Sequence, residues 1–395
     1  MPKLLQINEC LNFSTGKIAQ QIGEAAIFMG WGSYIAYSSR EKDIESKSET
    51  IKVGSRISPY FHYLESKIFD REGMSSRRAT RKLVEHIQDI KPDIIQLHNI
   101  HDHWLNYKIL FEYLNRTDIK VVWTFHDCWA FTGHCFHFVT KNCEKWKTGC
   151  YDCPLKNEYP KTWLDRSKMN YELKKRLFTA NKNLTIVACS EWMADLTRQS
   201  FLKDKRIEII HNGIDLDVFK PSKEKLQDGV YKILAVSNVW NKEKGYYDIL
   251  KLRKLLPSEY EITIVGLTTE QQKSLPQGIN GILRTQNIQE MVDLYSSANV
   301  LINPTYADTF PTINIEALAC GTPVITYETG GSPEIIDSDT GIVIEQGNIE
   351  QLTFAIKKLR NTSLKDEDCR RRAEKYFNKD ERFMDYVKLF EDLIS

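Results

Sequence analysis

The sequence predicts an α/β protein of two doubly wound domains, each a parallel β-sheet covered by helices. Short apolar runs typical of buried parallel strands alternate with helix-length amphipathic segments along the chain. The length of 395 residues exceeds one ordinary domain. The alternation restarts at Tyr231, after a charged stretch without apolar periodicity at 220–229. We therefore predict one domain over 1–220, a second over 221–377, and a final helix over about 378–395.

The composition is that of a globular protein, with 42% apolar and 27% charged residues. A net charge of +1 argues against a nucleic-acid partner and against a strong membrane field. No apolar run approaches the ~20 residues that span a bilayer, and the first strand, 4–7, starts without the apolar core of a signal peptide. We expect a cytoplasmic protein. Nine cysteines without a secretion signal favour thiols or metal ligands over a disulfide framework.

The first domain begins with a strand, a small-residue loop and a helix. Further strands are expected at 33–37, 93–97, 121–125, 184–189 and 207–210, and helices at 18–29, 77–90 and 106–114. In the first loop Gly16, next to Lys17, would let a substrate approach the backbone, although an ordinary strand–helix turn explains the same residues. Segment 41–76, which includes Arg56, indicates loops and a short helix, either a solvated excursion or an acceptor contact.

A lysine-rich helix is expected over 155–180. Its basic residues are Arg166, Lys174, Lys175 and Arg176. Such a stripe can meet an anionic lipid carrier or a membrane surface, and a solvated helix face gives the same pattern.

Two strands of the first domain end in histidine-rich loops. His98, Asn99 and His101 follow the strand 93–97, and His126 and Asp127 follow the strand 121–125. An imidazole beside a carboxylate at the carboxyl end of a strand is placed for catalysis, although a hydrogen-bonded structural pair looks the same. Clustered histidines also suggest metal chemistry. Because the loop after the strand 93–97 has no acidic residue at a fixed spacing from its histidines, we favour a polar surface that contacts an acceptor over a metal site.

Four cysteines fall within nineteen residues. Cys150 and Cys153 form a Cys-x2-Cys knuckle, and Cys135 and Cys143 precede it. Four thiolates can complete a tetrahedral structural zinc site. The loop is polar, with no apolar core of its own, so a metal would fold it. Free thiols in a mobile loop, or two disulfides in an oxidising compartment, fit equally well, and His134 and His137 are alternative ligands.

The second domain is organised around a strand, a loop, a short helix and a strand. The strand is 300–302, Pro311 suits the first turn of the helix, Gly321 suits its exit, and 324–327 is the next strand. A loop that feeds a helix N-terminus at the carboxyl end of a parallel strand is where such sheets bind phosphates. The N–H groups near Thr312, Ile313 and Asn314 should therefore face an anion.

The remaining elements of the second domain follow the same alternation. Strands are expected at 231–237, 262–266, 282–284 and 341–344, and helices at 246–256, 288–297, 349–359 and 366–394, the last with a break near Asn378. Lys244 lies at a strand–helix turn, where it is a natural phosphate counterion, with Lys242 as a substitute. Arg284, at the exit of the short strand, would border a nucleotide base.

The central stretch resembles the Glu-x7-Glu signature of retaining glycosyltransferase family 4. Asp308 and Glu316 stand at the two acid positions, and Ala-Leu-Ala-Cys-Gly-Thr-Pro-Val-Ile follows at 317–325. Thr-Phe-His-Asp at 124–127 and Asn-Gly-Ile-Asp at 212–215 are similar to segments of the same family. The chain departs from the family at two positions. Asp308, a shorter acid, stands where the signature has its first glutamate, and Asn238 stands near the position of a family arginine.

The resemblance implies the GT-B architecture, two such domains facing across a cleft, with the final helix crossing back onto the first. It implies that Asp308 contacts the donor sugar, that Glu316 contacts the ribose and that His126 lies beside the reacting sugar. The full set of expected site residues is catalytic His126, Asp127 and Asp308; donor-binding Gly16, Lys17, Asn238, Lys244, Arg284, Phe310, Thr312, Ile313, Asn314 and Glu316; and acceptor-side His98, Asn99 and His101.

The implied activity is retaining transfer of a sugar from a nucleotide diphosphate sugar to a glycan or lipid-linked acceptor, in surface polysaccharide synthesis. Lys244 and the helix N-terminus at Thr312 would stabilise the leaving diphosphate, so catalysis requires no metal. Peripheral contact with the inner face of a membrane is expected from the basic stripe. Two alternatives stay open: an epimerase or hydrolase acting on nucleotide sugars, and a noncatalytic nucleotide-sugar-binding protein, which Asp308 and Asn238 motivate.

Overall fold

The computed structural model describes residues 1–40, 44–55, 57–222, 229–362 and 364–395. Arg56 and most of the charged stretch 220–229 lie outside these ranges. The chain forms two compact units. Unit 1 comprises Met1–Ile210 and Arg382–Ser395, and unit 2 comprises His211–Glu381. The division thus follows Ile210, ten residues before the position that the composition suggests.

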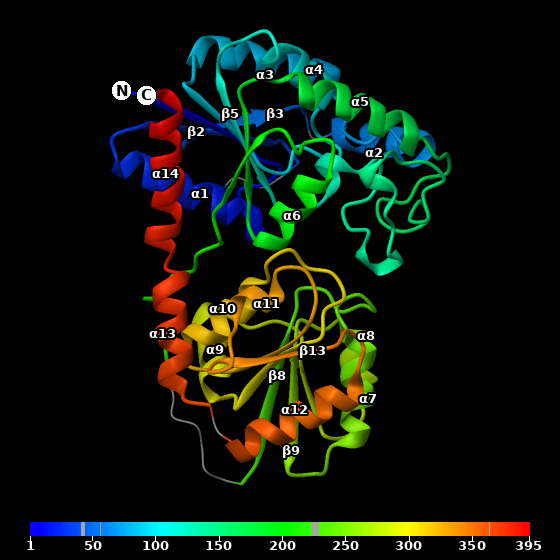
Figure 1. Cartoon of the computed structure of the whole chain (residues 1–395), viewed down its shortest axis with the longest axis vertical. Helices are drawn as coiled ribbons and strands as arrows, with labels where there is room; N and C mark the ends of the chain where they lie inside the picture. The colour runs from blue at the N-terminus through cyan, green and yellow to red at the C-terminus, as the bar shows by residue number, and fades with distance from the viewer. Residues whose placement is uncertain (41–43, 56, 223–228, 363) are drawn as a thin grey trace. The chain divides into compact units, whose positions relative to one another are not determined.

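Unit 1 contains a parallel sheet of seven strands in the order β3-β2-β1-β4-β5-β6-β7 (Figure 1). Its strands are β1 (Lys3–Ile7), β2 (Gly32–Ser38), β3 (Glu49–Val53), β4 (Ile94–Leu97), β5 (Lys120–Phe125), β6 (Leu184–Ala188) and β7 (Arg206–Ile209). The strand order reverses between β1 and β4, which pair directly with each other. At such a switch point the loops on the two sides part, and ligands bind at the carboxyl ends of the strands.

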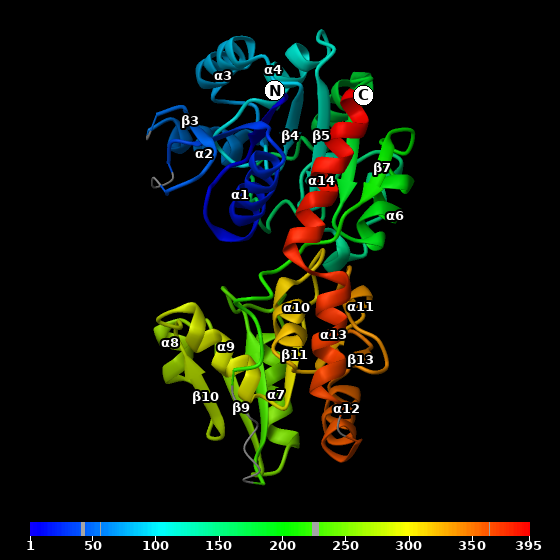
Figure 2. The same cartoon turned by 90° about the vertical axis from the view of Figure 1, so that its left-hand side faces the viewer.

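Helices cover both faces of the unit 1 sheet. They are α1 (Phe13–Phe28), α2 (Ser58–Phe69), α3 (Arg77–Ile90), α4 (Tyr107–Leu114), α5 (Ser167–Ala180), α6 (Glu191–Gln199) and α14 (Lys379–Ile394). Helices α3, α4 and α5 pack on one face, and α1 and α14 pack side by side on the other (Figures 1 and 2). On α14, Phe383, Tyr386 and Phe390 lie in the core with Ile18 and Trp31. The last helix therefore completes the core of the unit that begins the chain.

Unit 1 corrects three sequence predictions. Helix α1 begins at Phe13 rather than at residue 18, so Gly16 and Lys17 lie within the helix. Segment 41–76 contains a further strand, β3, and a full helix, α2. The expected helix over 155–180 begins only at Ser167, because the preceding residues bond elsewhere: Trp163 donates its backbone N–H to the Lys67 carbonyl at 2.8 Å.

Unit 2 contains a second parallel sheet, of six strands, in the order β10-β9-β8-β11-β12-β13. Its strands are β8 (Tyr231–Val236), β9 (Tyr260–Val265), β10 (Ile279–Ile282), β11 (Val300–Asn303), β12 (Val324–Tyr327) and β13 (Gly341–Ile344). The switch point lies between β8 and β11. Two parallel α/β units confirm the predicted fold class.

The helices of unit 2 are α7 (Tyr246–Leu255), α8 (Thr269–Lys273), α9 (Ile288–Ser297), α10 (Thr312–Ala319), α11 (Ser332–Ile335), α12 (Ile349–Thr362) and α13 (Asp366–Tyr376). Buried residues of α7 and α12 form the core on one face, and Figure 1 shows α9 and α10 on the other. The predicted strand–loop–helix–strand unit is present as β11, α10 and β12, with Gly321 in the left-handed region after the helix. In the described part of the chain, no helix is long and apolar enough to cross a membrane.

Candidate functional site

A lysine–carboxylate pair marks the switch point of unit 2. Lys244 follows β8 and Asp308 follows β11, and the two loops meet because these strands are neighbours. The Lys244 Nζ lies 2.8 Å from Asp308 Oδ2 and donates to the Ala307 carbonyl at 3.3 Å. Both side chains are partly exposed. The ammonium is thus anchored at one end of the sheet and open to an anionic ligand.

Close backbone contacts hold these loops together. A Cβ at Gly245 would come 2.1 Å from the Pro304 carbonyl oxygen, and one at Gly330 would come 1.7 Å from the Asp308 carbonyl oxygen. Both glycines also have positive φ, which disfavours other residues. At both positions a side chain larger than that of glycine would collide with the backbone of a neighbouring loop. The close packing of the loops after β8, β11 and β12 therefore fixes the position of Asp308.

Helix α10 begins beside the pair. Pro311 is its N-cap residue, and Thr312 and Ile313 open the first turn. Initial N–H groups of a helix have no intrahelical partner and attract anions. The Asn314 N–H instead donates to the Pro311 carbonyl at 3.2 Å, and its side-chain oxygen accepts from Asn303 Nδ2 at 2.9 Å. Asn314 is buried, so its side chain connects α10 to β11 and does not face a ligand.

Glu316 lies one turn inside α10 and is held by a tyrosine. The Tyr295 hydroxyl, from α9, donates to Glu316 Oε2 at 2.7 Å. Burial and the Glu316 charge raise the pKa of Tyr295 well above its ordinary value, so the hydroxyl keeps its proton. Tyr295 was not predicted as a site residue, because it stands at an apolar position of a predicted helix and its sequence neighbours do not indicate a bond to Glu316.

The other predicted donor-side residues are dispersed. Phe310 is buried, with its ring centroid 4.8 Å from that of His211, so it packs rather than faces solvent. Asn238 is exposed at the end of β8, and Arg284 is exposed after the edge strand β10. In unit 1, the space beside Gly16 is filled by the Leu11 backbone, whose carbonyl carbon would lie 2.4 Å from an added Cβ. Local packing therefore accounts for that glycine.

The switch point of unit 1 brings four predicted residues into two hydrogen-bonded pairs. His98 follows β4 and His126 follows β5, and His98 Nδ1 lies 3.1 Å from His126 Nε2. His98 Nε2 lies 3.1 Å from Gln6 Oε1, an acceptor only, so this nitrogen carries the proton and His98 Nδ1 accepts from His126. Burial lowers the pKa of His98, and it lowers that of His126 to about 4. Both rings are therefore neutral near pH 7.

His101 pairs with Asp127. His101 Nε2 lies 2.8 Å from Asp127 Oδ2, and Asp127 Oδ1 accepts the Trp129 backbone N–H at 2.8 Å. Burial opposes the charge of His101, but Asp127 and the neighbouring Asp102 hold its pKa well above the ordinary value. His98, Asn99, His101, His126 and Asp127 all line one small cavity of about 10 Å³, room for about one water molecule.

Two glutamates beside this pair were not predicted: Glu72, which is buried, and Glu9, which is partly buried. Burial, together with the charge of Asp102, raises the pKa of Glu9 to about 8 and that of Glu72 to about 7. Glu72 accepts the Asp102 backbone N–H at 2.9 Å. Glu9 follows β1 at the switch point, a position that the strand prediction could have flagged.

The cysteine loop has an apolar core of its own, which corrects the sequence interpretation. The Trp146 ring stacks on Phe138 at a centroid distance of 4.8 Å and contacts Phe131 at 5.3 Å. Lys174, expected on a surface stripe, is 2% exposed and donates to the Trp129 carbonyl at 2.7 Å. Aromatic packing therefore organises the loop around this buried lysine.

None of the nine cysteines, all of which lie in the described residues, forms a disulfide. The Cys135 and Cys153 side chains share a hydrogen bond, which lowers the pKa of Cys153 to about 7. Cys150 Sγ accepts the Gly133 N–H at 3.2 Å. Three ligating atoms within 4.8 Å of one another occur, in the residues described, at Glu72, His101 and Asp102 and not among the cysteines.

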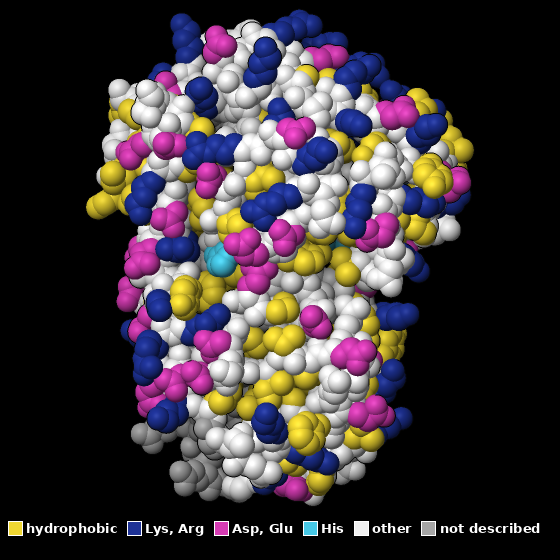
Figure 3. Space-filling view, in the orientation of Figure 1, with side chains coloured by type: hydrophobic (Ala, Val, Ile, Leu, Met, Phe, Trp, Pro, Cys, Tyr) yellow, Lys and Arg dark blue, Asp and Glu magenta, His cyan; other side chains and the backbone are white. Residues whose placement is uncertain are grey.

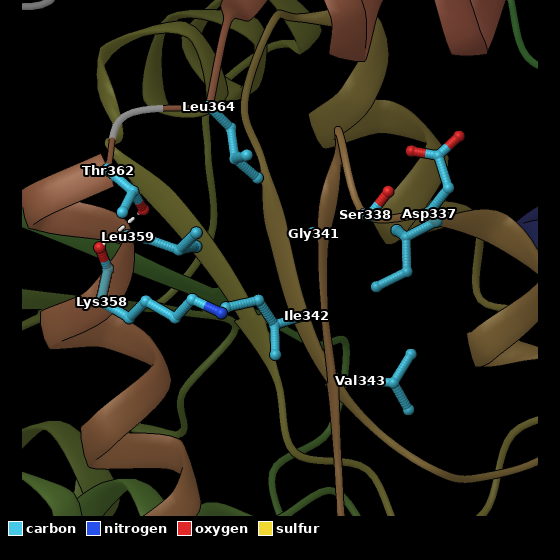
Figure 4. Close-up of a pocket in the computed structure, with 10 residues that line it drawn as sticks. Asp337, Ser338, Gly341, Ile342, Val343, Lys358, Leu359, Thr362 and Leu364 are labelled. Carbon is cyan, nitrogen blue, oxygen red and sulfur yellow. Dashed lines mark hydrogen bonds between the residues drawn. The ribbon is translucent and has the colours of Figure 1, made fainter.

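A groove of about 400 Å³ lies in unit 2 between β13 and the C-terminal end of α12 (Figure 4). Ile342, Leu359 and Leu364 line it, and the Lys358 side chain runs along it toward Ile342. None of the residues singled out by the sequence lines this groove, and we assign it no function.

Comparisons with known proteins cover most of the chain. The family described as "Glycosyl transferases group 1" matches residues 218–376, and "Glycosyltransferase Family 4" matches residues 38–218. A similar sequence is "Putative colanic acid biosynthesis glycosyl transferase WcaC" from Escherichia coli (strain K12), 24% identical over 400 residues, covering 95% of this chain and 96% of that protein. The "Capsular polysaccharide biosynthesis glycosyltransferase CapM" of Staphylococcus aureus is 25% identical over 218 residues, covering 49% of this chain and 57% of that one.

Solved structures share the fold. Sucrose-phosphate synthase from Thermosynechococcus elongatus superposes with a TM-score of 0.74 at 17% identity, covering 100% of this chain and 99% of that chain. Anabaena HepE in complex with UDP-glucose gives 0.65 at 12% identity, covering 99% of each chain. At these identities the likeness concerns the fold, and the fold is that of the GT-B glycosyltransferases.

Proposed function

This chain belongs to the glycosyltransferases, in the families described as group 1 and family 4, and from this premise we propose that it transfers a sugar from a nucleotide diphosphate sugar with retention of anomeric configuration. The acceptor that we propose is a glycan or a lipid-linked sugar of a surface polysaccharide. Relatives named for colanic acid and capsular polysaccharide synthesis support this class of acceptor. The HepE complexes with UDP-glucose and UDP support a nucleotide diphosphate sugar as donor.

The single observation that carries the proposal is the Lys244–Asp308 pair beside the start of α10. Breaking the bond between sugar and diphosphate leaves negative charge on the diphosphate. In this proposal the Lys244 ammonium and the first N–H groups of α10 stabilise that charge. Asp308 keeps Lys244 in place before the donor binds and then contacts the sugar.

The remaining residues have supporting roles in the proposal. Glu316, oriented by the Tyr295 hydroxyl, binds ribose hydroxyls of the donor. His98, Asn99, His101, His126 and Asp127 present polar groups at one small cavity and would bind sugar hydroxyls. No covalent nucleophile is assigned, and the acceptor attacks the face from which the diphosphate leaves. No metal has a part in this chemistry.

The test is transfer by the Lys244→Ala variant. Losing a fixed donor to the developing charge should lower kcat about 10²–10³-fold. Lys242→Ala is the matched control, since Lys242 is an exposed lysine of the same loop. NMR of the product reads the anomeric configuration. An inverted product contradicts the mechanism, equal rates in both variants contradict the site, and rapid turnover of donor without acceptor points to a hydrolase or epimerase.

We propose peripheral contact with an anionic membrane as a second part of this function. Exposed aromatic and aliphatic side chains gather on and beside α2, among them Tyr60, Phe61, Leu64 and Trp163. Figure 3 shows hydrophobic and basic side chains together on this side of unit 1. Cosedimentation with phosphatidylglycerol vesicles tests the contact: Phe61→Ser with Trp163→Ser should reduce binding, and Phe354→Ser, an exposed phenylalanine of unit 2, should not.

We also propose that the cysteine loop binds a structural zinc ion. Cys135 and Cys153 share a hydrogen bond, the charge of Cys150 raises the pKa of Cys135, and the charge of Cys153 raises that of Cys150. Cys143 and Cys150 would have to move toward that pair to complete four thiolate ligands.

A further inference from the structure

Glu72 and Asp102 have no part in the transfer proposed above, yet both lie beside His101 in unit 1, Glu72 buried and Asp102 partly buried. A ligating atom of each of these three residues lies within 4.8 Å of one from each of the others. Glu72 follows α2, whereas His101 and Asp102 follow β4, so the cluster joins two segments distant in sequence. We propose that Glu72, His101 and Asp102 form a binding site for a divalent metal ion, distinct from the cysteine loop and sharing only His101 with the residues of the proposed transfer.

Two atoms of the cluster lack the partner that a buried polar atom needs. Glu72 Oε2 and His101 Nδ1 are buried and have no hydrogen-bond partner among the described residues, and each residue is only 7% exposed. His101 Nδ1 has only an ion pair with Asp102 Oδ2 at 3.7 Å, a distance too long for a hydrogen bond. Buried polar groups are almost always satisfied, so these two atoms indicate a missing ligand.

The hydrogen bond of His101 to Asp127 prepares the ring for a metal. His101 Nε2 donates to Asp127 Oδ2 at 2.8 Å, so Nδ1 is the nitrogen that faces the cluster, and a metal ion would take its lone pair by displacing the Nδ1 proton. Histidines that ligate metals almost always donate their other N–H to a carboxylate in this way. Asp127 is itself fixed by the Trp129 N–H at 2.8 Å.

The two carboxylates are held in the same manner, by one oxygen each. Glu72 Oε1 accepts the Asp102 backbone N–H at 2.9 Å, and Asp102 Oδ1 accepts the Tyr159 hydroxyl at 2.9 Å. Asp102 adopts a φ of +68°, a left-handed conformation that is uncommon outside glycine. Local structure therefore orients all three side chains toward one point.

Charge and donor type identify the class of ion. Four buried or nearly buried carboxyl groups, Glu9, Glu72, Asp102 and Asp127, lie around His101. The cations facing them are His101 itself, Arg40, paired with Glu9, and Lys174, which acts on Glu72 from α5. A divalent ion bound here would displace the His101 proton and pair with the carboxylates of Glu72 and Asp102. Two carboxylates and one imidazole suit a first-row ion such as Mn²⁺, whereas thiolates would select zinc.

The experiment titrates chelator-stripped protein with MnCl2 alone and follows free Mn²⁺ by electron paramagnetic resonance. We expect one ion per chain. Glu72→Gln should abolish this binding, and Asp127→Asn, which changes no ligand, should weaken it about 10–100-fold because the imidazole loses its acceptor. Glu85→Gln, an exposed glutamate of α3, is the matched control and should bind as the wild type does.

The absence of stoichiometric Mn²⁺ binding to the wild-type chain overturns the proposal, as does an equal loss in Glu72→Gln and Glu85→Gln. If Glu72→Gln fails to fold, Asp127→Asn and Tyr159→Phe still decide, since both leave the three ligands in place and should weaken binding. Cys150→Ser must retain full Mn²⁺ binding. No donor or acceptor is present, so failure here is separable from failure of the transferase proposal.

Discussion

The two switch points occupy equivalent places in two parallel sheets, yet they are built differently. In unit 2 the charged pair Lys244–Asp308 is partly exposed, and close backbone contacts at Gly245 and Gly330 hold its loops. In unit 1 His98 and His101 after β4 are buried, the groups after β5 are partly buried, and a network of side chains around His101 holds them. In unit 2 the charged groups stay accessible to a ligand. In unit 1 most of the polar groups form hydrogen bonds with one another.

The two arrangements suit different kinds of ligand. A partly solvated ion pair can exchange its partner for a phosphate at small cost, as a site for a charged, departing ligand requires. A buried network is preorganised and rigid, and it suits a ligand that must be oriented or retained. The comparison predicts that unit 2 depends on backbone geometry and that unit 1 depends on buried charge.

The largest effect should come from Gly330→Ala, which tests the backbone half of the comparison. The new Cβ would lie 1.7 Å from the Asp308 carbonyl oxygen, and φ is +54°. Left-handed strain and the clash should together lower the free energy of unfolding by at least ~2 kcal/mol and displace Asp308. Urea unfolding measures this. At Gly229, φ is +79° and no atom of the described residues lies within 4 Å of an added Cβ, so Gly229→Ala should cost about 1 kcal/mol. Equal costs would mean that the contact is unimportant.

An effect that is smaller per pH unit should come from Lys174→Met, which tests the buried charge. Burial lowers the pKa of Lys174 from 10.5 to about 7. Between these values the unfolded chain binds a proton that the folded chain has released, so Lys174 makes stability rise with pH, by up to about 1.4 kcal/mol per unit. Relative to the variant, the wild-type protein should gain stability from pH 7 to pH 10. Lys175→Met, at the exposed neighbouring position, should follow the wild-type curve, and a flat difference for Lys174→Met would contradict the burial argument.

The smallest effect should come from removing metal from the cysteine loop. Because Trp146, Phe131 and Phe138 already form a core, loss of a zinc ion should lower the melting temperature modestly rather than unfold the loop. Elemental analysis of protein prepared under reducing, chelator-free conditions should find one zinc per chain, and Cys150→Ser should lack it. Donor binding, assigned to unit 2, should be unaffected. Protein without zinc from that preparation rules the site out.

The site in unit 2 was largely predictable because its signals are local. Pro311 and Gly321 bracket α10 in the sequence as they do in the structure, and Lys244 and Asp308 follow apolar runs that became neighbouring strands. The Tyr295–Glu316 bond was missed because it joins two helices whose packing no local pattern specifies.

The network in unit 1 was predictable only in part. His98 and His126 could be placed at strand ends, but their pairing, and the approach of Glu72 to His101, depend on the strand order and on segment 41–76. That segment seemed irregular because β3 is a short edge strand and α2 exposes many apolar side chains. Lys174 was assigned to the surface because lysines are rarely buried, and only its carbonyl partners make its position stable.

The position of α14 has a consequence for synthesis of the protein. The residues that close one face of the unit 1 core, Phe383, Tyr386 and Phe390, are translated 172 residues (382 minus 210) or more after the rest of that unit ends at Ile210. At 5–20 residues per second this interval is roughly 10–30 s. Throughout it, Ile18, Trp31 and their neighbours lack their final cover. The nascent chain therefore carries an apolar face while unit 2 is being made, and chaperone binding there should end when the last helix leaves the ribosome.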